Sequence, residues 1–335
     1  MKKLLKLMEE RQQTDPLAGE DTQPETSPSA LHGRAILIVG MAIVALLALA
    51  ALSPAPKVDD QQASAINAFD KVSLEAKAAI VVDMQSGKTL YEKNAEVQLP
   101  IASLTKVALA LTVAEALPLE SMVTIPYYAG GAGSDAHLLK GERWRVADII
   151  DFTLLESSNN GAAILAETAN SRLIELYPDS PTTLQHAATL ARMNALSKTL
   201  GLSQTYFLNV SGLDLSATQA GAYGSAKDMA KLFAYAASAQ AGLFQGTARD
   251  GILLTTQNGT QTSASNTNEV QGSIPGLIMG KTGLTDLAGG NLAVVFDVGL
   301  SHPVVAIVLG SSEQGRFRDM RKLVLMTRES LKNSE

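Results

Sequence analysis

Cysteine is absent from this chain of 335 residues, so disulfide bonds, thiolate nucleophiles and cysteine-ligated zinc sites are excluded. The histidines number only four and lack the spacing of a metal-ligand set: His32, His137, His186 and His302. Basic residues are not in excess either, because 27 Lys and Arg stand against 33 Asp and Glu, a net charge of −6. A nucleic-acid-binding domain is normally basic. We therefore expect no metal, no cofactor and no nucleic-acid partner.

Charged and polar side chains are missing from residues 35–52, a stretch of 18 apolar residues that follows Arg34. As a helix it would be about 27 Å long, close to the ~30 Å hydrocarbon core of a bilayer, which predicts a transmembrane helix. A cleaved signal peptide is an alternative, since Ala48-Leu49-Ala50 resembles a cleavage site. A buried helix of a soluble domain is another. The length and the 34 preceding residues favour an uncleaved anchor.

The composition on either side of this span indicates the domain organisation. Residues 1–34 are rich in Gln, Thr, Pro, Ser and Glu, which cannot bury a core, so we expect a disordered tail. Lys and Arg residues in the tail favour a cytoplasmic N-terminus. We expect residues 53–71 to form a linker and residues 72–335 to form a globular domain on the outer side of the membrane.

The globular part has strand patterns at both ends and a helical middle. The expected strands are residues 77–83, 89–93, 277–281, 291–298 and 304–309. Residues 103–237 are mostly helical in pattern, and a last helix is expected over residues 316–331. Strands at both chain ends around a helical middle predict an α+β fold, with one mainly antiparallel sheet and helices on its faces.

Ser103-Leu104-Thr105-Lys106 begins an expected apolar helix that continues to Leu117. A spacing of three residues brings Ser103 and Lys106 to the same helix face. A serine hydroxyl becomes a good nucleophile when a neighbouring base takes its proton, and a lysine can be that base when burial and a second cation keep it neutral. Taken alone, the tetrapeptide favours a helix-capping serine followed by a surface lysine.

Two further motifs follow along the chain. Ser157-Ser158-Asn159 offers a hydroxyl that can relay a proton and an amide that can hold a substrate backbone. Lys281-Thr282-Gly283 ends an expected strand and offers a cation and a hydroxyl to a carboxylate. The ordered trio S-x-x-K, S-D-N and K-T-G is typical of class A β-lactamases and penicillin-binding proteins. Here Ser158 stands in place of the Asp.

With these motifs, residues 73–328 resemble the low-molecular-mass penicillin-binding proteins of the D-alanyl-D-alanine carboxypeptidase family, which have a β-lactamase-like fold. The likeness extends beyond the trio to four segments: Asn194-Ala195-Leu196, Phe207-Leu208-Asn209-Val210-Ser211-Gly212-Leu213-Asp214, Ser225-Ala226-Lys227 and Gly280-Lys281-Thr282-Gly283-Leu284-Thr285-Asp286. The resemblance implies that Ser103 is the acyl-forming nucleophile and Lys106 the general base. It implies that Ser157 and Asn159 are the second-motif pair. A frame that starts at Ser158 also fits S-x-N, but only the Ser157 frame aligns the following helix without a gap.

The same resemblance implies a substrate-binding group around the third motif. Lys281 and Thr282 would bind the terminal carboxylate, and Gly283 would let the strand approach closely. The backbone N–H of Leu284, with that of the nucleophile, would form the oxyanion hole; the family more often has a polar or aromatic side chain at this position. Arg316, after the last strand, would reach the carboxylate site, although a place on the solvated face of the last helix is the alternative interpretation.

The function implied is that of a serine-type D-alanyl-D-alanine carboxypeptidase. The apolar residues 35–52 would anchor it in the bacterial cytoplasmic membrane. Its substrates would be peptidoglycan stem peptides ending in D-Ala-D-Ala, and β-lactams would inhibit it. A D,D-endopeptidase, a catalytically silent wall-binding homologue and a β-lactamase are the alternatives. A β-lactamase needs a water-activating carboxylate, and no acid between Glu167 and Asp179 has a suitable sequence context.

Overall fold

The computed structural model of the chain describes residues 68–70, 72–126 and 138–332. The expected tail, the expected transmembrane span 35–52 and most of the expected linker lie outside these residues. None of the described helices is both long and apolar enough to cross a membrane. Residues Ser64–Glu335 form one compact unit, which contains the candidate site.

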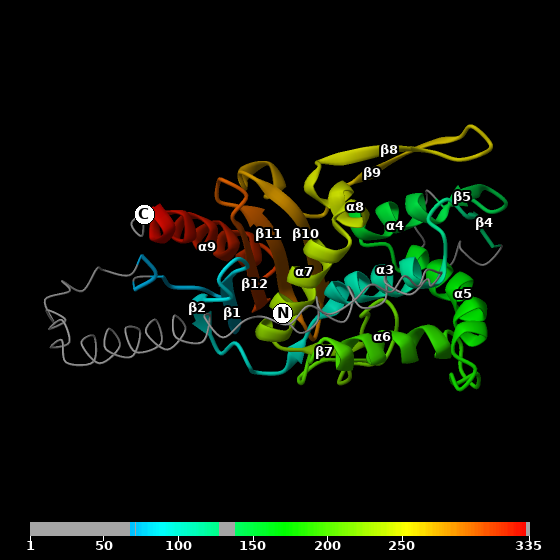
Figure 1. Cartoon of the computed structure of the whole chain (residues 1–335), viewed down its shortest axis with the longest axis horizontal. Coiled ribbons are helices and arrows are strands. Elements are labelled where there is room, and N and C mark those ends of the chain that lie inside the picture. The colour runs from blue at the N-terminus through cyan, green and yellow to red at the C-terminus, as the bar shows by residue number, and fades with distance from the viewer. Residues whose placement is uncertain (1–67, 71, 127–137, 333–335) are drawn as a thin grey trace, which may run out of the picture. The chain divides into compact units, whose positions relative to one another are not determined.

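A five-stranded sheet is built from both ends of this unit, in the order β10-β11-β12-β1-β2 (Figure 1). Its strands are β1 (Ala78–Asp83), β2 (Thr89–Lys93), β10 (Leu277–Thr285), β11 (Gly289–Asp297) and β12 (Pro303–Ser311). All four pairings are antiparallel, and Ile80 of β1 lies opposite Ile307 of β12. The predicted α+β fold, with one antiparallel sheet from both chain ends, is confirmed.

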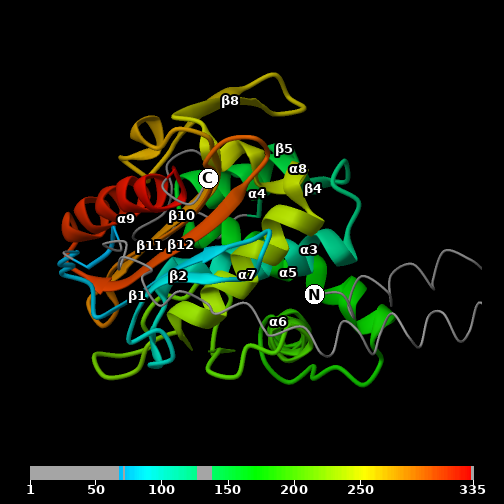
Figure 2. The same ribbon diagram turned by 60° about the vertical axis from the view of Figure 1, so that its left-hand side comes forward.

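The two faces of the sheet are covered by different helices (Figures 1 and 2). Side chains alternate along β12, because successive residues of a strand point to opposite faces. Ala306 and Val308 belong to the core that includes α9 (Gly315–Lys332). Val305 and Ile307 belong to the core on the other face, where α7 (Ala226–Ala239) contacts the sheet.

The predicted helical middle of the chain is confirmed, and its helix α3 (Thr105–Ala116) packs against α7. The other helices of this middle part are α4 (Val146–Leu155), α5 (Asn159–Leu176), α6 (Ala187–Thr199) and the short α8 (Ala241–Phe244). Helix α3 is apolar on most faces and contacts α5, α6 and α7, so its side chains are nearly all buried. The expected start of this helix at Ser103 is wrong: a 3₁₀ turn, η1 (Ala102–Leu104), precedes α3, which begins at Thr105.

Short strands that the sequence did not predict connect the helices. They are β3 (Leu99–Pro100), β4 (Met122–Thr124), β5 (Arg143–Arg145), β6 (Tyr206–Phe207), β7 (Ala222–Gly224), β8 (Gly251–Thr255) and β9 (Gln261–Ser265). Two further 3₁₀ turns, η3 (Gln245–Ala248) and η4 (Gln271–Ser273), flank the hairpin formed by the last two of these short strands. Strands β8 and β9 form this hairpin, which extends past α4 in Figure 1. The pairing of β3 with β7 matters for the site, because it fixes the backbone just before Ser103.

Candidate active site

Ser103 and Lys106 are brought together where η1 meets α3. The Lys106 Nζ lies 2.8 Å from the Ser103 Oγ, a distance that allows direct proton transfer. Ser103 is partly exposed, whereas Lys106 is fully buried within α3. The preceding Ala102 has a φ of +47°, in the left-handed region that residues with a Cβ rarely adopt. Such backbone strain is often found at functional sites.

Lys106 has two further partners from distant parts of the chain. Its Nζ donates to Asn159 Oδ1 at 2.9 Å and to the Ser211 carbonyl oxygen at 3.0 Å. Asn159 is the first residue of α5, and Ser211 lies in the loop before β7. Both of these oxygens accept hydrogen bonds and cannot donate one. The amine is therefore held in a fixed position beside Ser103.

The second serine of the site is Ser157, which the structure places opposite Lys281. The Lys281 Nζ donates to Ser157 Oγ at 2.9 Å. Ser157 has a φ of +58°, so its backbone turns sharply before α5. The next residue, Ser158, is buried and caps α5, because its Oγ accepts the Gly161 N–H at 2.7 Å. Of the two frames open from the sequence, only the one that starts at Ser157 puts a serine at this lysine.

Basic side chains are concentrated around Lys281. Its side chain is buried, and burial lowers its pKa well below the usual value; the charges of Lys106 and Arg316 lower it further. Burial also lowers the pKa of Arg316. Across the described ranges, neither Lys281 nor Arg316 has a carboxylate within ion-pair distance. An anionic ligand would favour the protonated forms of these basic side chains and so fits this site.

The residues that follow Lys281 on β10 lie beside η1, the 3₁₀ turn that carries Ser103 and that we call the nucleophile turn. Thr282 is buried, and its Oγ1 lies 2.6 Å from the Oγ1 of Thr267. A β-carbon on Gly283 would lie 3.0 Å from the Ile101 carbonyl oxygen and 3.3 Å from the Ser103 nitrogen. Glycine therefore permits the close approach of β10 to the nucleophile turn. The following Leu284 has an exposed side chain.

Arg316 lies against this strand rather than in solvent. Its Nη1 donates to the Gly283 carbonyl oxygen at 3.1 Å, and its guanidinium lies 4.6 Å from the centre of the Phe317 ring. The side chain is only 6% exposed, so the interpretation of Arg316 as a charge on the solvated face of α9 is wrong. That interpretation suits Arg318, which forms an exposed ion pair with Glu75.

The loop between β6 and β7, to which the sequence analysis assigned no role, positions groups in the site. The Asn209 Oδ1 accepts the Ser211 N–H at 3.2 Å and the Gly212 N–H at 2.7 Å, which orients the Ser211 carbonyl toward the buried amine. Asp214 accepts hydrogen bonds from the Thr285 hydroxyl and from a backbone N–H of the following turn. The Asn and Gly in this segment are turn signals, but a backbone carbonyl has no signature in the sequence.

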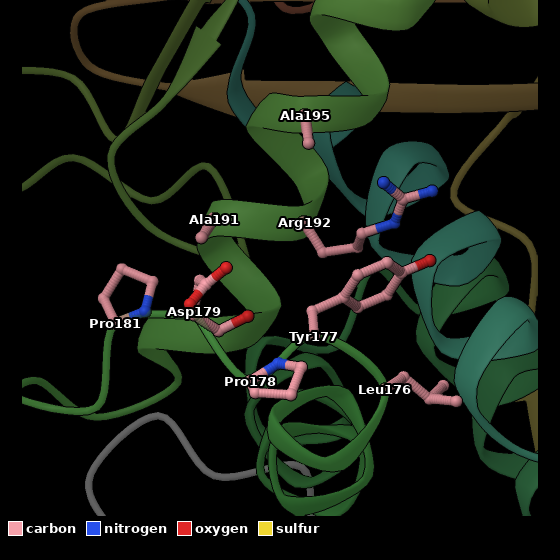
Figure 3. A pocket seen from close by; sticks show the side chains of 9 residues that line it. Leu176, Tyr177, Pro178, Asp179, Pro181, Ala191, Arg192 and Ala195 are labelled. Carbon is pink, nitrogen blue, oxygen red and sulfur yellow. The ribbon is translucent and has the colours of Figure 1, made fainter.

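A separate pocket lies at the opposite end of α5 from Asn159, about 25 Å along the helix. Figure 3 shows the side chains that line it. Its wall includes Tyr177 and Arg192, whose guanidinium lies 4.8 Å from the centre of the tyrosine ring. Both side chains bond to Glu115 of α3. Because the arginine is paired there, the pocket lacks the unpaired cations of the Ser103 site. The described residues also contain no group of three His, Asp or Glu placed to hold a metal ion.

Comparison with known proteins gives a consistent result over the described unit. The family model described as "D-alanyl-D-alanine carboxypeptidase" matches residues 62–313. The chain is similar to the D-alanyl-D-alanine carboxypeptidase DacF of Bacillus subtilis, at 30% identity over 71% of this chain and 58% of the relative. It is also similar to a D-alanyl-D-alanine endopeptidase of Escherichia coli, at 27% identity over 84% of this chain and 86% of the relative. The chain thus spans little more than half of DacF.

Solved structures have a similar fold. Penicillin-binding protein D2 of Listeria monocytogenes, in its cefotaxime-bound form, has a TM-score of 0.63 and 30% sequence identity. The superposition covers 76% of this chain and 98% of that structure.

Proposed function

The chain belongs to the D-alanyl-D-alanine carboxypeptidase family of serine-type peptidases, and on that premise we propose that it removes the terminal D-alanine from peptidoglycan stem peptides ending in D-Ala-D-Ala. The observation that carries the proposal is the fully buried Lys106 amine, 2.8 Å from the partly exposed Ser103 hydroxyl. A second lysine, Lys281, lies in the same site without an ion-pair partner in the described ranges. Together they supply a nucleophile, a base and an anion site.

In this mechanism Lys106 is neutral when the reaction begins. A neutral amine has two N–H groups and one lone pair. In this neutral form the N–H groups would go to Asn159 Oδ1 and the Ser211 carbonyl. The lone pair would accept the Ser103 O–H, whose oxygen lies 2.8 Å from Nζ. Lys106 then takes the hydroxyl proton as Ser103 Oγ attacks the carbonyl carbon of the penultimate D-alanine. The proton passes to the leaving amine, and water later hydrolyses the acyl-enzyme.

The second-motif pair and β10 position the substrate in this proposal. Ser157, hydrogen-bonded to Lys281, relays a proton toward the leaving amine, and the Asn159 amide holds the substrate backbone. The backbone N–H groups of Ser103 and Leu284 stabilise the oxyanion, since Gly283 brings β10 against the nucleophile turn.

Recognition of a free chain end favours a carboxypeptidase over an endopeptidase. The terminal carboxylate would lie at Lys281, Thr282 and Arg316, where two cations lack a carboxylate partner within the described residues. A planar guanidinium suits a carboxylate because it can donate two parallel hydrogen bonds. An endopeptidase cleaves inside a cross-link, where the leaving group need not be the end of a chain. A silent homologue would not need the nucleophile and base so placed.

β-Lactams are proposed as inhibitors because they too present a carboxylate and a reactive carbonyl. Turnover of the resulting acyl-enzyme should be slow. The carboxylate of Glu167 lies eight residues after Asn159, about 12 Å along α5, and its Oε2 lies 3.3 Å from His186 Nε2. It is therefore not placed to activate a water at Ser103, which argues against a β-lactamase.

The membrane anchor in this proposal is residues 35–52, and residues 72–335 act outside the membrane. The proposal depends on the uninterrupted apolar stretch. If the anchor is uncleaved, the mature protein keeps Met1 and stays with membranes after an alkaline wash. A mature N-terminus after residue 50, with release into the soluble envelope fraction, would contradict it.

The activity is tested by digesting muropeptides with the full chain in detergent and following the products by mass spectrometry. We expect pentapeptides to become tetrapeptides with release of D-alanine, and Ser103→Ala to be inactive. Cleavage of cross-linked dimers with pentapeptides left intact would instead identify an endopeptidase. No change in either substrate would identify a silent homologue.

A further inference from the structure

The Asn209 side chain closes the loop between β6 and β7 through hydrogen bonds to its own backbone. Its Oδ1 accepts the Gly212 N–H at 2.7 Å and the Ser211 N–H at 3.2 Å. Its Nδ2 donates to the Leu213 carbonyl oxygen at 2.7 Å. An asparagine that bonds backbone groups two and three residues further on forms an Asx-type turn. One side chain therefore fixes the conformation of residues 209–213.

The hydrogen bond from Gly212 determines where the Ser211 carbonyl points. The Ser211 C=O and the Gly212 N–H belong to the same peptide group, which is planar and trans, so they point in opposite directions. The N–H meets the Asn209 Oδ1 on one side, and the C=O meets the Lys106 Nζ at 3.0 Å on the other. Asn209 therefore acts on Lys106 through one rigid peptide group.

The surroundings of this loop keep it against the nucleophile turn. Gly212 has a φ of +80°, and a β-carbon there would lie 2.0 Å from the Ala102 carbonyl oxygen. A β-carbon on Gly221, just before β7, would lie 2.3 Å from the Asn209 Nδ2. Both distances are too short for a real side chain, so glycine is needed at each position. The sequence thus leaves room for the Asn209 side chain and for close contact with the turn that carries Ser103.

The direction of the Lys106 lone pair depends on the Ser211 carbonyl. A neutral amine can direct its lone pair at the Ser103 O–H only while its two N–H groups have other acceptors. The Asn159 Oδ1 is one such acceptor and the Ser211 carbonyl is the other. If the carbonyl moved away, the amine could turn an N–H toward the Ser103 Oγ instead. In that orientation it could not take the hydroxyl proton.

We propose that Asn209 is a positioning residue for acylation: by fixing the Ser211 carbonyl, it keeps the lone pair of Lys106 directed at Ser103. This inference rests on the proposed function, because it takes Lys106 as the base in acyl transfer to Ser103. It adds to that function a residue from outside the three motifs.

The test measures acylation of the full chain by benzylpenicillin in detergent. Varying the penicillin concentration separates the limiting acylation rate from the dissociation constant of the preceding complex. In Asn209→Ala the limiting rate should fall roughly three- to tenfold, the factor that one net hydrogen bond contributes. The dissociation constant should not change, because Lys281 and Thr282 still bind the carboxylate. Asn209→Ser keeps a weaker acceptor for the same N–H groups, so its rate should fall less.

The matched control is Asn170→Ala on α5. The Asn170 Oδ1 likewise accepts two backbone N–H groups, those of Ala188 and Thr189, at 3.1 and 3.4 Å. Its loss should lower stability to a similar degree and leave both acylation constants unchanged. Urea unfolding of each variant checks that stability is comparable.

A double-mutant cycle with Lys106→Arg separates a positioning role from a structural one. In the Lys106→Arg chain no amine base remains to be positioned, so adding Asn209→Ala should cause no further loss of acylation, followed by intact mass spectrometry. An equal loss in both backgrounds, or an unchanged rate in Asn209→Ala, would refute the proposal. If Asn209→Ala does not fold, Asn209→Ser takes its place in the same cycle. A folded wild-type chain that benzylpenicillin does not acylate would instead refute the proposed function.

Discussion

Replacing Arg316 with alanine should damage substrate recognition far more than stability. In the folded chain its Nη1 donates to the Gly283 carbonyl, whereas its Nε has no hydrogen-bond partner within the described structure. Removing the side chain loses that hydrogen bond, but it also relieves the cost of burying a charge near Lys281. These effects oppose each other, so we expect the free energy of unfolding to change by only about 1 kcal/mol.

Binding of a carboxylate has no such compensation. A hydrogen bond to a charged group contributes about 1.5–3 kcal/mol, so kcat/KM for a D-Ala-D-Ala peptide should fall roughly 10- to 150-fold in Arg316→Ala. Acylation by a β-lactam should suffer less, because Lys281 and Thr282 remain to bind its carboxylate. The loss should therefore be larger for the peptide than for benzylpenicillin.

The assay is release of D-alanine from a diacetylated Lys-D-Ala-D-Ala peptide by the full chain, with urea unfolding measured in parallel. The matched control is Arg318→Ala, two residues along α9. It removes only an exposed ion pair with Glu75, worth about 0–1 kcal/mol, and should leave turnover unchanged. Equal, small effects of the two substitutions on peptide turnover would remove Arg316 from the site.

Three further predictions concern the other charged and polar side chains. Lys106→Arg cannot give up a proton, so benzylpenicillin acylation, followed by stopped-flow fluorescence, should fall by ~10²–10⁴; near-normal acylation would point to another base. Ser158→Ala should lower the unfolding free energy by ~1 kcal/mol through loss of the helix cap, whereas Ser157→Ala should slow acylation; the reverse pattern would restore the Ser158 frame. Because burial lowers the folded-state pKa of Lys281, the unfolded chain binds more protons, and any stability gained by Lys281→Met in urea titrations should shrink as the pH rises toward the unfolded-state pKa of ~10.4; a gain that grows with pH would contradict this.

The main sheet was predictable because its strands are long and rich in β-branched residues, as in β12. The pairing of both chain ends followed from the α+β pattern. The short strands β3, β6 and β7 were not predictable, because two or three residues carry no periodic signal. They form only when the surrounding helices bring the segments together.

Some features of the candidate site could likewise be predicted from the sequence, and others could not. Ser103 and Lys106 lie one turn apart in sequence, so their proximity follows from local geometry. The choice between Ser157 and Ser158 depends on a left-handed φ at Ser157. Serine rarely adopts this conformation, so the sequence does not predict it. The Ser211 carbonyl was unpredictable for a different reason, since every residue has a carbonyl and only the tertiary fold selects one.

The most direct test of the account is mass spectrometry of the intact full chain after incubation with benzylpenicillin, followed by peptide mapping. If Ser103 is the nucleophile, one covalent penicilloyl adduct should form, located on the peptide that contains Ser103 and absent from Ser103→Ala. An adduct that persists in Ser103→Ala, or no adduct on a folded wild-type chain, would contradict the assignment of Ser103 and Lys106 as nucleophile and base.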